Sequence, residues 1–377
     1  MTLAVLAGSA CAVLTAANLL SLGVASSRLR PRSRRPTTRT DPVSIVRPVC
    51  GLEPFVEETL ASGFRLDHPD YELIFCAERA DDPVVPLVRG LIEAHPQVPA
   101  RLLIGEDRIS GNPKLNNCVK GWQAARHGWI VLADSNVLMP PDYLQHLLDA
   151  WRDDTGLVCS TPLGSHAGNF AAWMECAFLN TLQARWQYFG EAIGLGFAQG
   201  KSMLWQRDFL EAQGGIRALG AEIAEDAAAT KLVRAAGRHV HLVDAPFEQP
   251  LGRRTPRQVW LRQLRWARLR RVTFPLFFAP ELFSGAAVPM VLGLVAAGAA
   301  GVSLPLVAAA LLLLWYGPEA ALARAKGWPL SWRLLPAFLA RDATIPVLWL
   351  GGWTTGATVW RGNTLPFDGA VSRPAPG

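Results

Sequence analysis

The sequence has few charged residues for a chain of its length. Only 18% of its 377 residues are Asp, Glu, Lys or Arg, whereas 50% are hydrophobic. This composition is too apolar for a purely soluble enzyme, and it is too polar for a protein made only of membrane helices. The length allows one globular domain of ordinary size together with membrane segments.

Cysteine patterns typical of zinc sites are also missing. The six cysteines form no CxxC pair, and no histidine lies at zinc-ligand spacing from any of them. Some of them, such as Cys76 and Cys159, stand in short apolar runs that are typical of buried strands. We therefore expect all six cysteines to be reduced, buried, small hydrophobic side chains in a reducing compartment.

The N-terminal run from Thr2 to Ser27 has no charged residue and consists mostly of Leu, Ala and Val. A membrane-spanning helix needs about 20 apolar residues, so residues 1–27 are predicted to form one. A cleavable signal peptide is the alternative, but it would carry positive charge before its apolar core. Here the arginines follow, in a basic linker over residues 28–42. The positive-inside rule places that linker in the cytoplasm and the N-terminus outside.

Residues 43–250 alternate short β-rich runs with helical patterns, which predicts an α/β domain. The predicted strands are Val43–Val46, Glu72–Cys76, Arg101–Ile104, Trp129–Leu132 and Gly156–Cys159. The predicted helices are Val84–Ala94, Leu115–Arg126 and Tyr143–Trp151. Continuous apolar strands separated by helices favour a buried, mostly parallel sheet. Ligands of such sheets bind beyond the carboxyl ends of the strands, and Asp82 and Asp134 both follow strand ends.

A basic segment over residues 251–280 mixes arginines with Trp and Leu at helical spacing. This pattern predicts an amphipathic helix at a membrane surface, and the alternative is an ordinary solvent-exposed helix face. The segment contains Arg262-x-x-Arg265-Trp266, which we call the Arg-Trp motif.

Residues 281–360 are predicted to form a C-terminal membrane region of two to three helices. The last of these helices, from about Pro336 to Thr358, contains Arg341 and Asp342. Charged residues are costly in lipid unless they are paired, so a re-entrant or interfacial segment is the alternative there. Residues 361–377 are predicted to be a tail.

Three acidic positions precede the Arg-Trp motif along the chain. They are Asp82 after one predicted strand, Asp134 after a later strand and Asp226 at a predicted helix start. Their order, together with the Arg-Trp motif beside membrane segments, resembles the membrane-bound inverting glycosyltransferases with the GT-A fold, which is Rossmann-like. Among these enzymes, the chain most resembles the ceramide glucosyltransferases, over about residues 43 to 285.

The resemblance implies the catalytic residues. Asp226 would be the general base that takes the acceptor proton, which forms a β-glycoside from an α-linked donor; Glu225 beside it is expected to point elsewhere. A charge that complements the helix dipole is the alternative for Asp226. Arg262 and Arg265 would hold phosphate and Trp266 would stack on a sugar or base. The alternative for all three is a membrane-surface helix without a catalytic part.

The resemblance also implies how the donor is held. The expected substrate-binding residues are Asp82, Asp134, Lys114, Asn112, Asn116 and Glu53. Asp134 and Asn136 are expected to hold Mg²⁺ or Mn²⁺, hard cations that take few carboxylates and keep several waters. Asp82 is assigned to the nucleotide, with Asp81 as its alternative, and an ordinary turn at a helix start explains either residue without a ligand.

The predicted function is transfer of glucose from UDP-glucose to ceramide. The protein would be a multi-pass protein of a bacterial inner membrane with its catalytic domain on the cytoplasmic side. The same chemistry on a hopanoid or other lipid, or with UDP-N-acetylglucosamine or UDP-galactose, stays open, as does a non-catalytic protein that binds a UDP-sugar or a lipid. A processive polysaccharide synthase is disfavoured because the hydrophobic segments are too few to enclose a polymer channel. A nucleic-acid binder is disfavoured because the arginines lie beside membrane segments.

Overall fold

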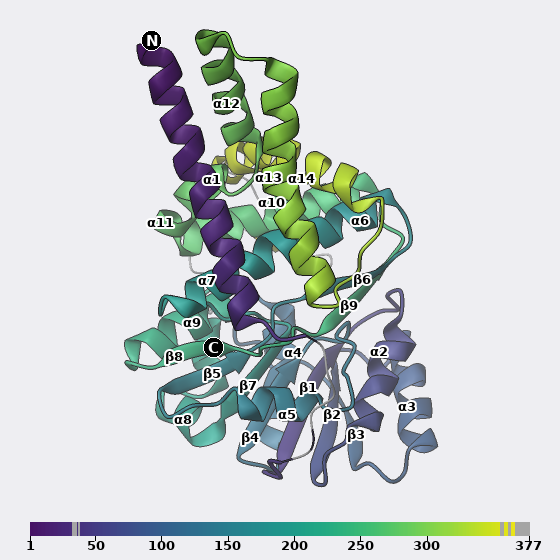
Figure 1. The fold of residues 1–377 in the computed structure, drawn as a ribbon. Coiled ribbons are helices and arrows are strands. Elements are labelled where there is room, and N and C mark those ends of the chain that lie inside the picture. The colour runs from purple at the N-terminus through teal and green to yellow at the C-terminus, as the bar shows by residue number, and fades with distance from the viewer. Residues whose placement is uncertain (32–35, 37, 355–357, 361–362, 366–377) are drawn as a thin grey trace. The chain divides into compact units, whose positions relative to one another are not determined.

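The computed structural model divides into two compact units (Figure 1). It describes residues 1–31, 36, 38–354, 358–360 and 363–365, so most of the predicted tail and part of the basic linker lie outside the described residues. The described residues of the sheet unit lie within Arg32–Leu163 and Gly190–Leu251. The helical unit contains Met1–Pro31, Gly164–Phe189 and Gly252–Asp368.

A seven-stranded sheet with the order β3-β2-β1-β4-β7-β5-β8 forms the centre of the sheet unit (Figure 1). The strands are β1 (Val43–Val49), β2 (Tyr71–Ala77), β3 (Ala100–Ile104), β4 (Trp129–Ala133), β5 (Thr155–Cys159), β7 (Ser202–Gln206) and β8 (His239–Leu242). Four neighbouring pairs are parallel, and β7 runs antiparallel to both β4 and β5. The predicted α/β fold with a mostly parallel sheet is confirmed, whereas β7 and β8 were not predicted.

Helices cover both faces of this sheet. They are α2 (Val56–Ser62), α3 (Val84–Ala94), α4 (Pro113–Ala124), α5 (Tyr143–Asp149), α8 (Arg207–Ala212) and α9 (Glu225–Ala235), with 3₁₀ turns at Gly63–Arg65 and Ile216–Ala221. Alternate strand residues such as Ile45 and Phe75 join a core with α2, α3 and α5. On the opposite face, a Cβ at Gly121 of α4 would lie 2.4 Å from Val46 and 2.7 Å from Cys76. Glycine therefore lets α4 approach the sheet closely.

Helices form most of the helical unit, and several of them are hydrophobic. They are α1 (Thr2–Arg28), α6 (Phe170–Ala177), a π-helix (Phe178–Ala184), α7 (Arg185–Ala192), α10 (Pro256–Thr273), α11 (Pro275–Phe278), a 3₁₀ turn (Ala279–Phe283), α12 (Ala287–Ala300), α13 (Leu304–Ala325) and α14 (Leu334–Trp353). The chain passes between the units near strands β6 (Leu163–Ala167) and β9 (Glu248–Gly252) and within α7. A short hairpin of β10 (Thr358–Trp360) and β11 (Asn363–Leu365) follows α14.

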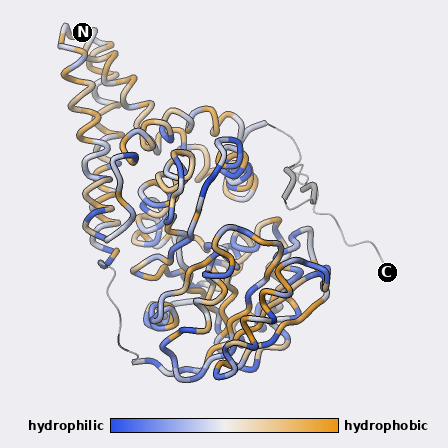
Figure 2. The backbone as a smooth tube through the Cα atoms, turned by 90° about the vertical axis from the view of Figure 1, so that its right-hand side faces the viewer, coloured by the Kyte–Doolittle hydropathy of each residue, from blue (hydrophilic) through white to orange (hydrophobic). Residues whose placement is uncertain are grey.

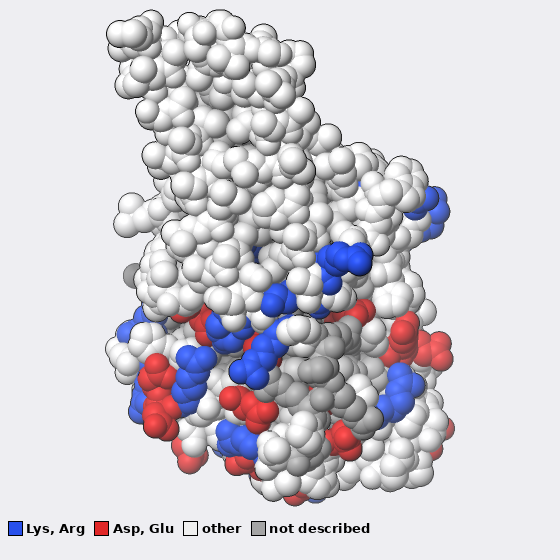
Figure 3. Space-filling view, in the orientation of Figure 1, with Lys and Arg blue, Asp and Glu red and all other residues white. Residues whose placement is uncertain are grey.

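Helices α1, α12 and α13 pack side by side (Figures 1 and 2). Figure 2 shows that they are largely hydrophobic along their length, and Figure 3 shows a broad uncharged face over them. Large apolar side chains on these helices, such as Leu6, Val13, Val291 and Leu313, are 61–74% exposed. An exposed apolar surface of this extent fits lipid rather than water.

Within the described part of the chain, three helices are long and apolar enough to cross a membrane: α1, α13 and α14. The residues Pro275–Phe283 and Ala287–Ala300 form a bent pair, with an angle of 43°, that would count as a fourth span. The predicted N-terminal helix is therefore present among the described residues, and the apolar helices of the predicted C-terminal region follow it in the helical unit.

The charges in α14 are buried and paired. Arg341 donates to Glu319 of α13 at 2.8 and 3.1 Å and to the neighbouring Asp342 at 2.6 Å. This pairing removes the reason for expecting a re-entrant segment, because a neutralised pair is far less costly in lipid than a lone charge. Residues 164–189, inside the predicted domain 43–250, group with the helical unit because α6 packs on α10 and α14.

The prediction that the cysteines are buried holds for five of the six. All six are free thiols, and Cys11, Cys76, Cys118, Cys159 and Cys176 are buried. Cys50 is exposed, so the prediction that all six are buried is wrong. It lies directly after the end of β1, in a loop rather than in the hydrophobic strand itself.

Candidate active site

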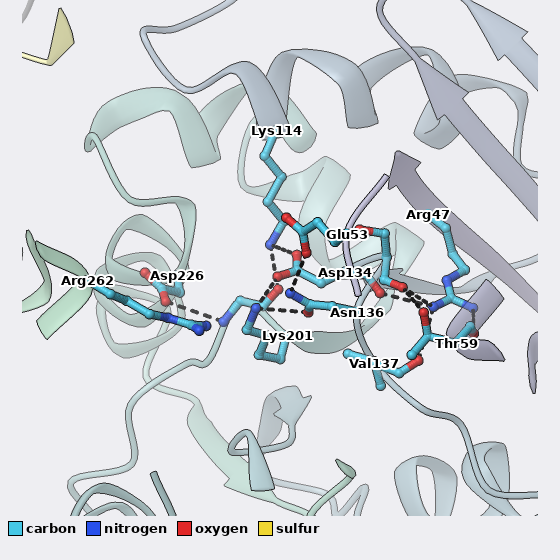
Figure 4. A network of polar contacts seen from close by, with 12 residues as sticks. Arg47, Glu53, Thr59, Lys114, Asp134, Asn136, Val137, Lys201, Asp226 and Arg262 are labelled. Atoms are coloured by element: carbon cyan, nitrogen blue, oxygen red, sulfur yellow. Dashed lines mark hydrogen bonds and ion pairs between the residues drawn. The ribbon is translucent and has the colours of Figure 1, made fainter. Parts of the chain in front are cut away.

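Asp134 stands at the carboxyl end of β4, where antiparallel strand β7 places a lysine against it. The register pairs Ala133 with Ser202, so Asp134 and Lys201 are the next residues along the two strands. The backbone N–H of Asp134 donates to the Lys201 carbonyl at 3.0 Å. Lys201 Nζ then lies 2.7 Å from Asp134 Oδ2 (Figure 4). The strand pairing itself therefore builds this ion pair.

Lys114 joins the same cluster from the first turn of α4. Its Nζ lies 2.6 Å from Asp134 Oδ1 and 2.6 Å from Glu225 Oε1. It also donates to the carbonyl oxygen of Gly200. Asn112 is the N-cap of α4, because its side-chain oxygen accepts from the backbone N–H groups of Lys114 and Leu115. Its side-chain amide also donates a hydrogen bond of 2.6 Å to Glu225. Two lysines thus hold Asp134, and one of them also holds Glu225.

Asp226 lies in the first turn of α9, beside Glu225. Its Oδ2 accepts a hydrogen bond of 3.3 Å from the backbone N–H of Gly200. A Cβ at Gly200 would lie 2.7 Å from Glu225 Oε1, 3.1 Å from Lys114 Nζ and 3.6 Å from Asp226 Oδ2. The expectation that Glu225 points elsewhere is wrong, because both carboxylates approach the Gly200 backbone. A side chain at position 200 would push them apart.

The charges of this cluster shift its pKa values in opposite directions. Burial would raise the pKa of Asp134, but the Lys114 and Lys201 ammonium groups outweigh it and hold that pKa well below its usual range. Burial and the neighbouring Glu225 raise the pKa of Asp226 to about 6, although Lys114 acts in the other direction. Asp134 is therefore ionised at every physiological pH, whereas Asp226 can exchange a proton near neutrality.

Asp82 closes a loop at the end of β2. Its carboxylate oxygens accept from the backbone N–H of Gly51 at 2.9 and 3.1 Å, and one of them accepts from Val84 at 2.9 Å, where α3 begins. Gly51 has a φ of +66°, which glycine adopts without strain. In the loop after β1, the Glu53 carboxylate accepts a hydrogen bond of 3.4 Å from the Asn136 side-chain amide. Asp82 has local partners of the kind a turn provides, and its role toward a nucleotide stays a prediction.

Arg47 is a part of the site that was not predicted. It is completely buried in β1, and its guanidinium donates to the carbonyl oxygens of Asp134, Ser135 and Val137 at 3.1–3.2 Å and to Thr59 at 2.8 Å (Figure 4). Burial lowers the pKa of Arg47 to about 10, so it stays charged at neutral pH. Arg47 fixes the backbone that carries Asp134 and Asn136.

Asn116 is occupied by its own loop. Its side chain accepts from the backbone N–H groups of Ile109 and Ser110 at 3.0 Å and donates to Glu106 and to the Ser110 carbonyl at 3.0 Å. The residue is 2% exposed. Through these contacts, Asn116 stabilises the loop before α4. Its direct contact with a substrate stays a prediction.

The Arg-Trp motif lies in α10 of the helical unit. Thr255 and Gln258 form a capping box that begins this helix. Arg262 is paired with Glu175 of α6, and its guanidinium stacks over Trp266, 4.7 Å from the ring centroid. Glu175 is 1% exposed and also lies 3.5 Å from Arg254. Within this unit, one buried carboxylate therefore fixes the first arginine of the motif; Arg265 is on the same helix.

The proposed metal ligands are an incomplete set by themselves. Among the described residues, no group of three or more His, Cys, Asp or Glu side chains could hold a metal ion. Asp134 and Asn136 offer oxygen atoms, which suit Mg²⁺ and Mn²⁺, and such ions often take their remaining ligands from substrate phosphates. Both side chains accept from Lys201, at 2.7 and 3.1 Å. The residues fit an ion that a diphosphate brings with it, provided that Lys201 moves away.

The mostly parallel sheet and the helices long enough to span a membrane agree with a glycosyltransferase of the GT-A fold. The chain belongs to glycosyl transferase family 21, whose family model matches residues 7–369. Its relatives include ceramide glucosyltransferase 1 of Caenorhabditis elegans, 27% identical over 63% of this chain and 52% of the relative. The ceramide glucosyltransferase of Komagataella phaffii is 36% identical over 31% of this chain and 25% of the relative.

The chain thus spans about half the length of the Caenorhabditis elegans relative, and less of the other. Among solved structures, a mannosyltransferase from Pyrobaculum calidifontis in complex with GDP-mannose and Mn²⁺ has a TM-score of 0.49 and 19% identity, over 90% of this chain and 99% of that one. Glucosyl-3-phosphoglycerate synthase from Mycobacterium tuberculosis, with UDP and Mn²⁺, has a TM-score of 0.41 and 14% identity, over 67% of this chain and 87% of that one.

Proposed function

We propose that the protein is an inverting glycosyltransferase that transfers glucose from UDP-glucose to the primary hydroxyl of ceramide. One observation carries the proposal: Asp226, a carboxyl group whose pKa is raised to about 6, lies beside the Lys114–Asp134 ion pair at the carboxyl end of the sheet. A base that titrates near neutrality next to fixed positive charge is what transfer to a hydroxyl requires. The similarity to ceramide glucosyltransferases supports the lipid acceptor.

In this mechanism each residue has a separate task. Asp226 takes the proton of the acceptor hydroxyl while that oxygen attacks the anomeric carbon of the sugar, and the UDP oxygen leaves with the bonding electrons. Attack opposite to the leaving group inverts an α-linked donor to a β-glycoside. Lys114 offsets the negative charge that grows on the diphosphate. The Arg-Trp motif is proposed to supply three further catalytic residues: Arg262, Arg265 and Trp266.

The donor is proposed to bind with Mg²⁺ or Mn²⁺. Asp134 would hold the ion, with Asn136 as a neutral oxygen donor beside it. When bound, such an ion neutralises part of the diphosphate charge. Asp82 and Glu53 are proposed to face the nucleoside, and Asn112 and Asn116 to shape the approach to its phosphates.

The helical unit is proposed to hold the enzyme in a bacterial inner membrane and to deliver the lipid. Its uncharged face over α1, α12 and α13 supports insertion, and the arginines and tryptophans of α10 support a position at a membrane surface (Figure 3). The arginines that follow α1 in the sequence support a cytoplasmic position for the sheet unit.

A panel of donors and lipids tests the function directly. Purified full chain in detergent is incubated with UDP-glucose, UDP-galactose or UDP-N-acetylglucosamine, and with ceramide, a hopanoid or diacylglycerol. Glucosylceramide as the main product supports the proposal, and a main product with another sugar or lipid replaces that partner. UDP binding without any transfer would favour a non-catalytic binding protein instead.

The pH dependence of turnover is expected to follow Asp226. The base works only in its deprotonated form, so kcat/KM is expected to be constant above about pH 7 and to fall about tenfold per unit below pH 6. Glu225→Gln removes a negative charge beside Asp226 and should move this acid limb downward, toward the ordinary carboxyl pKa of about 4. The measurement is a pH profile of kcat/KM for both proteins.

Glu222→Gln provides the matched control for this profile. Glu222 precedes α9 and pairs with Lys231 at 2.6 Å, away from the Gly200 contacts. The acid limb of this variant should stay where the wild type has it. An acid limb that is identical in all three proteins would assign the titration to another group.

Glu175→Gln is expected to lower kcat by about 10²-fold, because a loosened Arg262 guanidinium no longer holds one orientation. Glu175→Asp keeps the negative charge and should recover much of the loss. Glu281→Gln is the control: Glu281 pairs with Arg270 of α10 at 2.6 Å but is partly exposed. Steady-state rates with UDP-glucose and ceramide decide the matter, and a Glu175→Gln variant with normal kcat would separate Arg262 from catalysis.

A further inference from the structure

Lys201 contacts both side chains that were predicted to bind a metal ion. Its Nζ lies 2.7 Å from Asp134 Oδ2 and 3.1 Å from Asn136 Oδ1, and its side chain is 15% exposed (Figure 4). The sequence places it in the loop that ends at β7, and the β4–β7 register carries it to this position. An ammonium group therefore stands where a divalent ion would find its protein ligands.

Lys201 sets the net charge of the ionisable cluster around it. The converging ionisable side chains are Lys114, Lys201, Asp134, Glu225 and Asp226. With all of them ionised, two lysines face three carboxylates, which leaves one net negative charge. Without Lys201 the cluster would carry two, and it would repel an anion such as a nucleoside diphosphate more strongly. The same change would make the cluster a better site for a dication.

The chemistry of lysine suits an exchange between these partners. Its ammonium carries three donors on a flexible four-carbon stem, so it can turn toward a phosphate oxygen without leaving the neighbourhood of Asp134. Lys114 is already engaged with Asp134, Glu225 and the Gly200 carbonyl.

We propose that Lys201 is a diphosphate-binding residue that acts as a resident cation of this site. It holds Asp134 and Asn136 when no nucleotide is bound and donates to the phosphates when a nucleoside diphosphate enters. The inference rests on the proposed sugar-nucleotide function and adds a consequence to it. Part of UDP binding does not depend on a divalent ion, and a divalent ion competes with Lys201 for Asp134.

Binding of UDP to the full chain in detergent tests this directly. Isothermal titration calorimetry is carried out with Mn²⁺ and, separately, with EDTA. For the wild type, EDTA should weaken binding by less than about tenfold. For Lys201→Met, EDTA should weaken it by more than about 30-fold, because a buried positive charge that faces the anion is gone. Lys201→Arg keeps the charge and should resemble the wild type.

Mn²⁺ binding without nucleotide gives a second measurement that does not involve turnover. The electron paramagnetic resonance signal of free Mn²⁺ should show tighter binding to Lys201→Met than to the wild type, by about tenfold or more. Lys231→Met is the control, because Lys231 pairs with Glu222 on the surface of α9. This variant should match the wild type in both assays.

The outcomes separate the two proposals. If Lys201→Met and the wild type show the same response to EDTA and the same Mn²⁺ affinity, the role of Lys201 is wrong while the sugar-nucleotide function stands. If the wild type binds no UDP under either condition, the proposed donor class fails. The Mn²⁺ measurement still reports whether Lys201 competes for Asp134 in that case.

Discussion

Replacing Asp226 with Asn is expected to lower kcat by about 10²–10⁴-fold, the usual contribution of a positioned general base. Asn has the shape of Asp, and its carbonyl oxygen can still accept the hydrogen bond from Gly200 N–H. It cannot take a proton from a hydroxyl. The variant should therefore bind UDP-glucose normally and turn it over slowly, which is measured as a loss in kcat with little change in KM for the donor.

Folding and chemistry can be told apart in this variant. Because burial and Glu225 raise the pKa of Asp226, the folded protein disfavours the ionised form, and a neutral Asn should leave the melting temperature unchanged or higher. Asp208→Asn is the matched control, since Asp208 is an exposed carboxylate in the first turn of α8. If Asp226→Asn turns over as fast as the wild type, Asp226 is not the general base.

Local sequence patterns predict the part of the site that depends on neighbouring strands. Strands β1, β2 and β4 are short apolar runs, and their parallel pairing brings the residues after their carboxyl ends to one edge. For this reason Asp82 and Asp134 could be selected from the sequence. Their catalytic or binding roles go beyond this geometry and rest on the resemblance to ceramide glucosyltransferases.

Lys201 could not be found in the same way. It meets Asp134 across 67 positions of sequence, through an antiparallel strand, Ser202–Gln206, that is only five residues long. Helix periodicity also misplaced Glu225, because the first turn of α9 faces a glycine loop that admits both carboxylates. Long-range pairing and the shape of a loop decide these contacts, and neither leaves a periodic pattern in the sequence.

The helical unit shows the same limit for buried charges. The sequence marked Arg341 and Asp342 as costly in a membrane without showing their partner, Glu319, which lies 22 residues before Arg341 on another helix. Arg341 also donates to the Ala177 carbonyl and to Thr181, both at 3.1 Å, and so joins α14 to the end of α6. Glu175, which holds Arg262, is two residues before Ala177. The buried cluster therefore supports the helix that supports the Arg-Trp motif.

Arg341→Met is accordingly expected to destabilise the helical unit by about 3–5 kcal/mol, the usual cost of removing one partner from a buried ion pair. Glu319 and Asp342, each 2% exposed or less, would lose their main cationic partner. Thermal unfolding in detergent should show a large fall in melting temperature. Arg333→Met, at an exposed arginine that stacks on Trp332, should change stability by less than about 0.5 kcal/mol.

A compensating variant distinguishes lost charge balance from lost packing. In Arg341→Met/Asp342→Asn, Glu319 keeps Arg185, 3.5 Å away. The new amide carbonyl at position 342 can still accept from Tyr316 and the Ala286 N–H, which contact Asp342 at 3.1 and 2.8 Å in the wild type. Neutrality is restored, so the double variant should be more stable than Arg341→Met. If it is less stable, the bidentate contacts of the guanidinium matter more than its charge. The order of stability of the two variants therefore tests one idea: α13 and α14 can hold ionised side chains inside a hydrophobic bundle because those charges neutralise one another.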